Sequence, residues 1–231
     1  MSEFIQNSAY FGLTLTFITF GIGNLAKKKF RNPLANPNII SIALIIIFLV
    51  SFDIDYDTYN KSAQYLSFLL TPATICLAIP LYEQLELLKK NFAAIMIGIF
   101  SGVIASGVSI LLLAIAFNLD QALYITLLPK SVTTAIGIAV SEELGGYPAL
   151  TVVSIMIAGL LGNVFSEVAC NLFRIKEPIA RGVGIGTASH AMGTAKAMEI
   201  GEVEGAMSGL SIAVAGVMTV AVASIFAQFM F

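Results

Sequence analysis

Two short polar stretches interrupt an otherwise apolar sequence, and they carry side chains that could bind a small anion. The first, LLPKSVTTA, has a proline, a lysine and three hydroxyl residues, and the second, GIGTASHAMGTAKA, has glycines, hydroxyls, the single histidine and a lysine. Hydroxyl and ammonium groups donate the hydrogen bonds that a carboxylate accepts. The candidate substrate-binding residues are Lys130, Ser131, Thr133, Thr134, Thr187, Ser189, His190, Thr194 and Lys196, and the candidate backbone hinges are Pro129, Gly184, Gly186 and Gly193.

The composition around these stretches is that of an integral membrane protein. Of the 231 residues, 58% are hydrophobic and 11% charged, and the mean hydropathy is +0.91. These values lie outside the range of soluble domains, and apolar windows of about 20 residues, long enough to cross a bilayer, recur along the chain. The sequence predicts six spans, near Ser8–Leu25, Pro37–Phe52, Ser62–Tyr82, Asn91–Asn118, Leu150–Leu172 and Ala206–Phe231.

Two further apolar segments, Ala122–Val140 and Ile179–Ala197, contain the polar stretches and are predicted to be broken helices. Non-helical backbone at membrane depth is tolerated only where protein or a water-filled cavity satisfies its polar groups. The free N–H groups at the start of a half-helix favour negatively charged ligands. Two breaks therefore predict one anion-binding cavity near the middle of the membrane.

The distribution of basic residues predicts that both broken segments are re-entrant hairpins. The cluster Lys27–Lys29 should be cytoplasmic by the positive-inside rule, with the N-terminus outside. If Ala122–Val140 crossed the membrane completely, Arg174, Lys176 and Arg181 would face outside, against the rule. A hairpin that enters and returns on one side keeps these residues inside.

The sequence also contains an apparent internal repeat. TTAIGIAVSEELGG resembles GTAKAMEIGEVEG, and ALTVVSIMIAGLLG resembles AMSGLSIAVAGVMT. Each unit has a hairpin and one span, so its second copy runs in the opposite direction across the membrane, as in many transporters. The predicted fold is all-α, with scaffold helices in residues 1–121 and a substrate-site domain of two inverted repeats, 122–173 and 178–231. In this alignment, extended backwards, Lys130 falls opposite His190.

Structural explanations of these residues remain open. A charge at the bilayer centre costs about 3 kcal/mol on insertion scales, which favours a functional Lys130, but its side chain could also reach the surface or pair with Glu142 or Glu143. His190 could couple transport to protons, since histidine has an ordinary pKa of about 6.5, or could simply donate a hydrogen bond between helices. The glycines could serve only close helix packing.

Other classes of function lack the residues they need. One histidine and two cysteines in other spans give no metal cluster, and Ser189 beside His190 has no triad geometry. The run GVGIGTASH lacks dinucleotide-loop spacing, and the basic residues form no nucleic-acid-binding face. We therefore expect neither an enzyme nor a bound cofactor or metal.

Several long stretches resemble the LrgB/CidB family, which includes antiholin-like LrgB proteins and the plastidial glycolate/glycerate translocator. The resemblance covers nearly the whole chain. It is carried by NPLANPNIISIALIIIFL, LLTPATICLAIPLYEQ, LLPKSVTTAIGIAVSEELGG and RIKEPIARGVGIGTASHAMGTAKAMEIGEVEGAMSGL.

The resemblance implies either transport of small carboxylates such as glycolate, glycerate or pyruvate, or holin/antiholin-like control of murein hydrolase export and cell lysis. The second function implies a small membrane partner of the LrgA/CidA type. We expect a multi-pass protein of the bacterial plasma membrane with cytoplasmic basic loops. We also expect a homodimer, and we take carriage of a small organic anion as the primary hypothesis.

Overall fold

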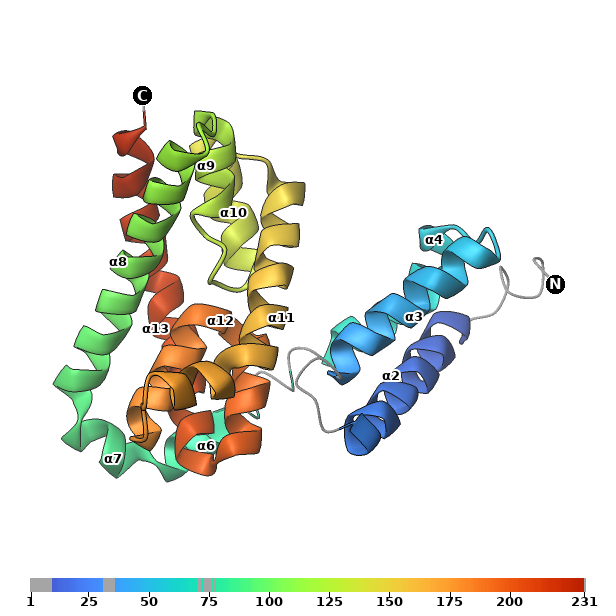
Figure 1. Cartoon of the computed structure of the whole chain (residues 1–231), viewed down its shortest axis with the longest axis horizontal. Coiled ribbons are helices and arrows are strands. Elements are labelled where there is room, and N and C mark those ends of the chain that lie inside the picture. The colour runs from blue at the N-terminus through green and yellow to red at the C-terminus, as the bar shows by residue number, and fades with distance from the viewer. Residues whose placement is uncertain (1–9, 31–35, 70–71, 73–75, 77, 231) are drawn as a thin grey trace. The chain divides into compact units, whose positions relative to one another are not determined.

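The computed structural model describes residues 10–30, 36–69, 72, 76 and 78–230, and all regular elements among them are helices (Figure 1). The predicted all-α class is therefore confirmed for this part of the chain. Contacts divide the chain into two compact units, Met1–Cys76 and Leu77–Phe231. The division into scaffold and substrate domains at residue 121, which was predicted on functional grounds, stays a prediction.

In the N-terminal unit, hydroxyl groups form hydrogen bonds between the helices. Thr19 Oγ1 lies 2.8 Å from Ser41 Oγ, and Gly12 N donates to Ser62 Oγ at 2.6 Å. Interhelical hydrogen bonds of this kind are common between membrane helices. The elements are α2 (Phe11–Phe30), α3 (Pro37–Ser51), α4 (Tyr56–Ala63) and η1 (Gln64–Leu69).

The C-terminal unit contains three long apolar helices, each of 25 residues. At 1.5 Å per residue each extends about 37 Å, which exceeds the roughly 30 Å hydrocarbon core. These are the described helices that are long and apolar enough to cross a membrane. The elements of this unit are α6 (Ala78–Glu83), α7 (Leu85–Lys90), α8 (Phe92–Ala116), α9 (Gln121–Leu127), α10 (Thr134–Leu144), α11 (Pro148–Leu172), α12 (Pro178–Ile200), α13 (Glu202–Phe226) and η2 (Ala227–Phe229).

The three long helices, α8, α11 and α13, correspond to the last three predicted spans. The second predicted span is α3, which has only 15 residues. The third predicted span, Ser62–Tyr82, contains the end of α4, η1 and part of α6, while residues 70–71, 73–75 and 77 lie outside the described residues. The first predicted span begins in residues that are also outside them.

Both breaks that the sequence predicts are present. Between α9 and α10 the helix is interrupted from Leu128 to Thr133, and the Pro129 carbonyl accepts a hydrogen bond from Val132 N at 3.2 Å. Proline supplies no amide hydrogen and disfavours a continuous helix here. Figure 1 shows α9 and α10 at the end of the unit where α8 finishes, and α12 toward the opposite end, near α6.

Helix α12 folds back on itself at His190, whose backbone is non-helical (φ 43°, ψ −142°). A Cβ on Gly193 would lie 3.1 Å from the carbonyl oxygen of Ile185, eight residues earlier. In a straight helix these residues are about 12 Å apart along the axis. Both halves also pack on the start of α13, the first through Gly182 and the second through Met198. Thus α12 is a helical hairpin with its turn at His190.

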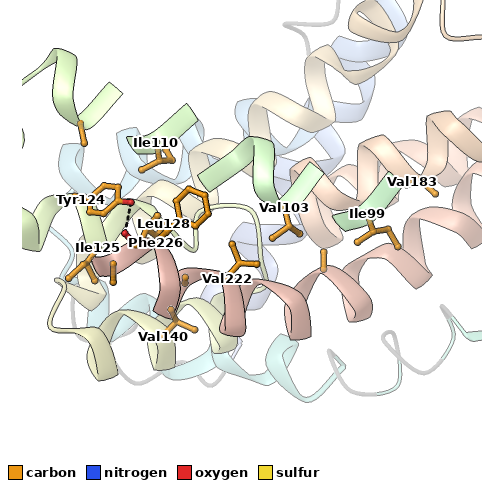
Figure 2. Close-up of a cluster of buried hydrophobic side chains, with 14 of the residues drawn as sticks. Ile99, Val103, Ile110, Tyr124, Ile125, Leu128, Val140, Val183, Val222 and Phe226 are labelled. Atoms are coloured by element: carbon orange, nitrogen blue, oxygen red, sulfur yellow. Dashed lines mark hydrogen bonds between the residues drawn. The ribbon is translucent and has the colours of Figure 1, made fainter. Parts of the chain in front are cut away.

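The core of the C-terminal unit lies where α8 and α13 meet α9 (Figure 2). The Tyr124 hydroxyl donates to the Phe226 carbonyl oxygen at 2.9 Å, so α9 is tied to the end of α13. Along α8, Ile99 and Val103 are buried in the cluster that includes Val222 of α13. This core holds the α9–α10 loop and the first half of α12 against the same two long helices.

Candidate functional site

A small cavity lies among α8, the α9–α10 loop, α12 and α13. Four hydroxyl residues, one from each element, line it together with apolar side chains: Ser106, Ser131, Thr187 and Thr219. Its volume is about 10 Å³, close to the minimum that a single water molecule occupies. The two broken segments therefore meet at a common cavity, with hydroxyls from the two spans that flank them.

The Thr187 hydroxyl is buried and has no hydrogen-bond partner among the described residues. The residue is 6% exposed, and a Cβ on Gly102 of α8 would lie 2.8 Å from its methyl carbon. The glycine thus allows α8 and α12 to approach closely. A buried hydroxyl without a partner costs about 1–3 kcal/mol. Thr187 is therefore a donor that is held at the cavity without a protein acceptor.

Lys130 connects to the cavity through its neighbour. Its ammonium Nζ donates to Ser131 Oγ at 2.8 Å, and Ser131 Oγ lies 3.5 Å from Ser106 Oγ. Lys130 is partly buried, and no carboxylate pairs with it among the described residues of the chain. Lys130 therefore does not form the ion pair with Glu142 or Glu143 that the sequence left open.

His190 lies buried at the turn of the α12 hairpin, against α11. Its Nε2 is 3.0 Å from the Ile155 carbonyl oxygen, and a Cβ on Gly159 would lie 2.8 Å from the same nitrogen. This hydrogen bond to α11 corresponds to the packing role that the sequence left open.

One face of α11 holds the tip of the hairpin. A Cβ on Gly162 would overlap the Ser189 hydroxyl, so only glycine permits this contact. At the next residue, Asn163 Nδ2 donates to the Met192 carbonyl oxygen at 2.6 Å. This bond satisfies a backbone acceptor at the helix break, as the membrane interior requires. Ser189 thus faces α11 rather than the cavity.

The other two predicted ligands on α12 make contacts within the protein. Thr194 Oγ1 donates to the His190 carbonyl oxygen at 3.0 Å and lies 2.7 Å from Ser208 Oγ of α13. Lys196 Nζ lies 2.8 Å from a Glu167 carboxylate oxygen and 3.6 Å from one of Glu199. Neither side chain lines the cavity.

The remaining predicted residues shape the backbone. Pro129 is buried beside Lys130, Thr133 is the N-cap of α10, and Thr134 is exposed on its first turn. Gly186 packs against the Ser208 backbone, and Gly193 against Ser189 and Ile185. A Cβ on Gly184 would meet no atom of the described residues within 4 Å, so close packing does not explain this glycine.

Sequence reasoning missed Ser106 and Thr219, which line the cavity from α8 and α13. A hydroxyl within a long apolar span is a weak signal, because such residues often bond to the carbonyl four residues earlier. Ser109 and Ser211 do so. Only the positions of the helices identify which hydroxyls face the cavity.

The chain is similar to known proteins over nearly its whole length. The model of the LrgB-like family matches residues 16–229. The chain belongs to the LrgB-like family. Its relatives include the antiholin-like protein LrgB of Bacillus mycoides (strain KBAB4), 39% identical over 221 residues, and that of Bacillus cereus (strain B4264), 38% identical over 221 residues. Each alignment covers 95% of this chain and 96% of the relative.

No solved structure matches this member of the LrgB-like family. The two relatives named above are bacterial, and the three long apolar helices among the described residues make this chain a multi-pass membrane protein. The recognition of the family from its motifs is confirmed.

Proposed function

We propose that this LrgB-like protein is a secondary transporter of small carboxylates, with its binding site at the cavity between the two broken helices. The observation that carries the proposal is the Thr187 hydroxyl, which has no partner among the described residues and lines the cavity together with Ser131, whose hydroxyl accepts a hydrogen bond from Lys130. A carboxylate accepts hydrogen bonds from all three groups, and bonds to charged acceptors are stronger than neutral ones.

The charges around the cavity favour an anion. Lys130 brings a positive charge without a carboxylate neighbour among the described residues. Placing such a charge in a membrane is costly, and intramembrane lysines commonly mark a substrate or ion pathway. A carboxylate bound beside Lys130 would offset that cost. His190, which is buried at the turn of the α12 hairpin, is the residue through which protons could be coupled to transport.

The size of the cavity implies that this conformation is closed. A volume of about 10 Å³ has no room for glycolate or pyruvate, so the site must open toward one side of the membrane at a time. The natural moving part is the α12 hairpin. Its turn residue has a strained positive φ of 43°, a conformation that costs a non-glycine residue of order 1–3 kcal/mol.

Alternating access fits two re-entrant hairpins that enter from opposite sides as an inverted repeat. We propose that α9–α10 and α12 are these hairpins, with a homodimer formed through the scaffold helices. Because α8 contributes Ser106 to the cavity, the working site extends beyond residues 122–231 into the last scaffold helix.

The test is uptake of labelled glycolate and pyruvate by proteoliposomes that contain the purified protein, with and without a pH gradient. We expect saturable uptake that Lys130→Gln reduces at least about tenfold, the loss of one charged hydrogen bond of about 1.5 kcal/mol or more. Lys89→Gln, which removes an exposed lysine, is the matched control. Full saturable uptake by Lys130→Gln would contradict the proposed site.

A second candidate function comes from the relatives, which are named antiholin-like proteins. A holin-like regulator or pore, acting with an LrgA/CidA-type partner, needs no saturable site. The same proteoliposomes distinguish the two functions. Unselective leakage of a trapped dye, without saturable carboxylate uptake, would favour the holin-like function.

A further inference from the structure

A second hollow lies between α11 and the first half of α12, with a volume of about 290 Å³. We call it the α11–α12 groove. It follows α11 from Leu161 to Phe173, about 18 Å at 1.5 Å per residue. Its walls are mainly apolar, with side chains of Leu161, Phe165, Cys170, Phe173, Ile175 and Ile185.

The lining of the groove suits hydrocarbon better than water. Two hydroxyl residues line it, Ser166 and Ser189, and the Ser166 hydroxyl has no hydrogen-bond partner in the described part of the chain. An ordered water needs two to four polar partners, so these hydroxyls cannot hold a chain of waters along the groove. A hydrated carboxylate therefore has no path here, whereas the groove opens along a helix that is long and apolar enough to cross a membrane.

The mouth of the groove is basic. Phe173 and Ile175 line it, so the residues next to them in the same loop, Arg174 and Lys176, lie at this end and are exposed. Arg181 fixes the loop, because its Nε donates to the Ile175 carbonyl oxygen at 2.8 Å. These three positive charges outnumber the neighbouring carboxylate of Glu177, and the carboxylate of Glu167 on α11 is paired with Lys196. Basic pockets between membrane helices on the cytoplasmic side bind anionic lipid head groups.

We propose that the α11–α12 groove binds an anionic phospholipid, with one acyl chain along α11 and the phosphate at Arg174 and Lys176. The length of the groove agrees with this ligand. One leaflet contributes about 15 Å, half of the roughly 30 Å hydrocarbon core, and the groove extends about 18 Å from the loop into the span. The lipid lies against the half of α12 that leads to the hairpin turn.

Gly184 provides a variant that fills the groove without disturbing the fold. It is exposed in the groove, and a Cβ on it would lie more than 4 Å from every other described residue except its chain neighbours and its own helix. Gly184→Leu therefore occupies the space of an acyl chain. Gly21→Leu is the matched control, because Gly21 of α2 is equally free of neighbours and lies in the other unit.

The chain contains no tryptophan, so a single Trp reports on one place. We would reconstitute Phe165→Trp, within the groove, and Phe100→Trp, exposed on α8, and quench each with brominated phosphatidylglycerol or brominated phosphatidylcholine. At position 165 we expect phosphatidylglycerol to be preferred by about fivefold for each basic residue that contacts the head group. At position 100 we expect no preference.

The preference should fall when Gly184→Leu or Lys176→Gln is added to Phe165→Trp, and should remain with Gly21→Leu. Equal quenching by the two lipids at position 165, or a preference that Gly184→Leu leaves unchanged, would overturn the proposal. Weak quenching by both lipids would also overturn it, because another part of the chain or a second copy then covers the groove. The measurement involves no transport, so it stands or falls separately from the proposed carboxylate site.

Discussion

Thr187 gives the sharpest test of the site, because its hydroxyl should destabilise the folded protein and at the same time bind the carboxylate substrate. Thr187→Val keeps the shape and the methyl group that meets α8, and Val and Thr have similar helix propensities. Removing a buried hydroxyl that lacks a partner should relieve a penalty of about 1–3 kcal/mol. For chains of 150–250 residues, 1 kcal/mol corresponds to about 2–4 °C in Tm. We expect Thr187→Val to raise Tm by at least about 2 °C.

Thr194 is the matched control on the same helix. It is also buried, but its hydroxyl bonds to the His190 carbonyl oxygen and to Ser208 Oγ. Thr194→Val leaves both partners unsatisfied in the interior, which should cost about 1–3 kcal/mol. The same substitution should therefore change Tm in opposite directions at two positions of α12.

The assay has two readouts, thermal unfolding in detergent and carboxylate uptake in proteoliposomes. We expect Thr187→Val to weaken apparent substrate affinity about 10- to 100-fold, the loss of one hydrogen bond to a charged group. Thr194→Val should affect affinity far less than stability. A fall in Tm for Thr187→Val, or an unchanged KM for uptake, would refute the reasoning that the Thr187 hydroxyl binds the substrate.

Three other predictions concern the helices around the site. A methyl group on Gly162 would overlap the Ser189 hydroxyl at the α12 turn, so Gly162→Ala should lower the free energy of unfolding by about 1–3 kcal/mol. Gly184→Ala, measured in the same unfolding assay, should leave it unchanged. Lys196→Gln removes a partly exposed ion pair, so it should lower the free energy of unfolding by at most about 1 kcal/mol. It should leave the KM for carboxylate uptake unchanged, and a loss of saturable uptake would show that Lys196 binds substrate. If α9–α10 is re-entrant, cysteines at Gln121 and Glu143, both exposed, should react with an impermeant thiol reagent from the same side of the membrane, and labelling from opposite sides would exclude it.

Much of the architecture follows from local patterns in the sequence. The three long spans are continuous apolar windows, and a helix in lipid must satisfy its own backbone, so hydropathy alone is enough to find them. Pro129 and the polar residues around it predicted the first break, and glycines with polar residues predicted the second. The sequence did not identify His190 as the turn, because a non-glycine residue with positive φ is held there by its surroundings.

The sequence could not predict which contact each hydroxyl residue of the second polar stretch makes. Thr187, Ser189 and Thr194 are chemically equivalent as donors, yet Thr187 faces the cavity, Ser189 faces α11 and Thr194 bonds to α13. Because α12 reverses direction at His190, helical periodicity cannot relate the residues before the turn to those after it. Their orientations depend on packing against helices that lie elsewhere in the chain.

The sequence by itself determined that this is an all-helical membrane protein of the LrgB-like family and where two of its helices break, because hydropathy, proline and glycine act on their immediate neighbours. The tertiary structure alone decided which hydroxyls meet. Ser106, Ser131, Thr187 and Thr219 come from four elements spread over more than half of the C-terminal unit. Their convergence depends on close approaches at glycines such as Gly102 and on the fold-back of α12, and both are properties of packing between distant segments.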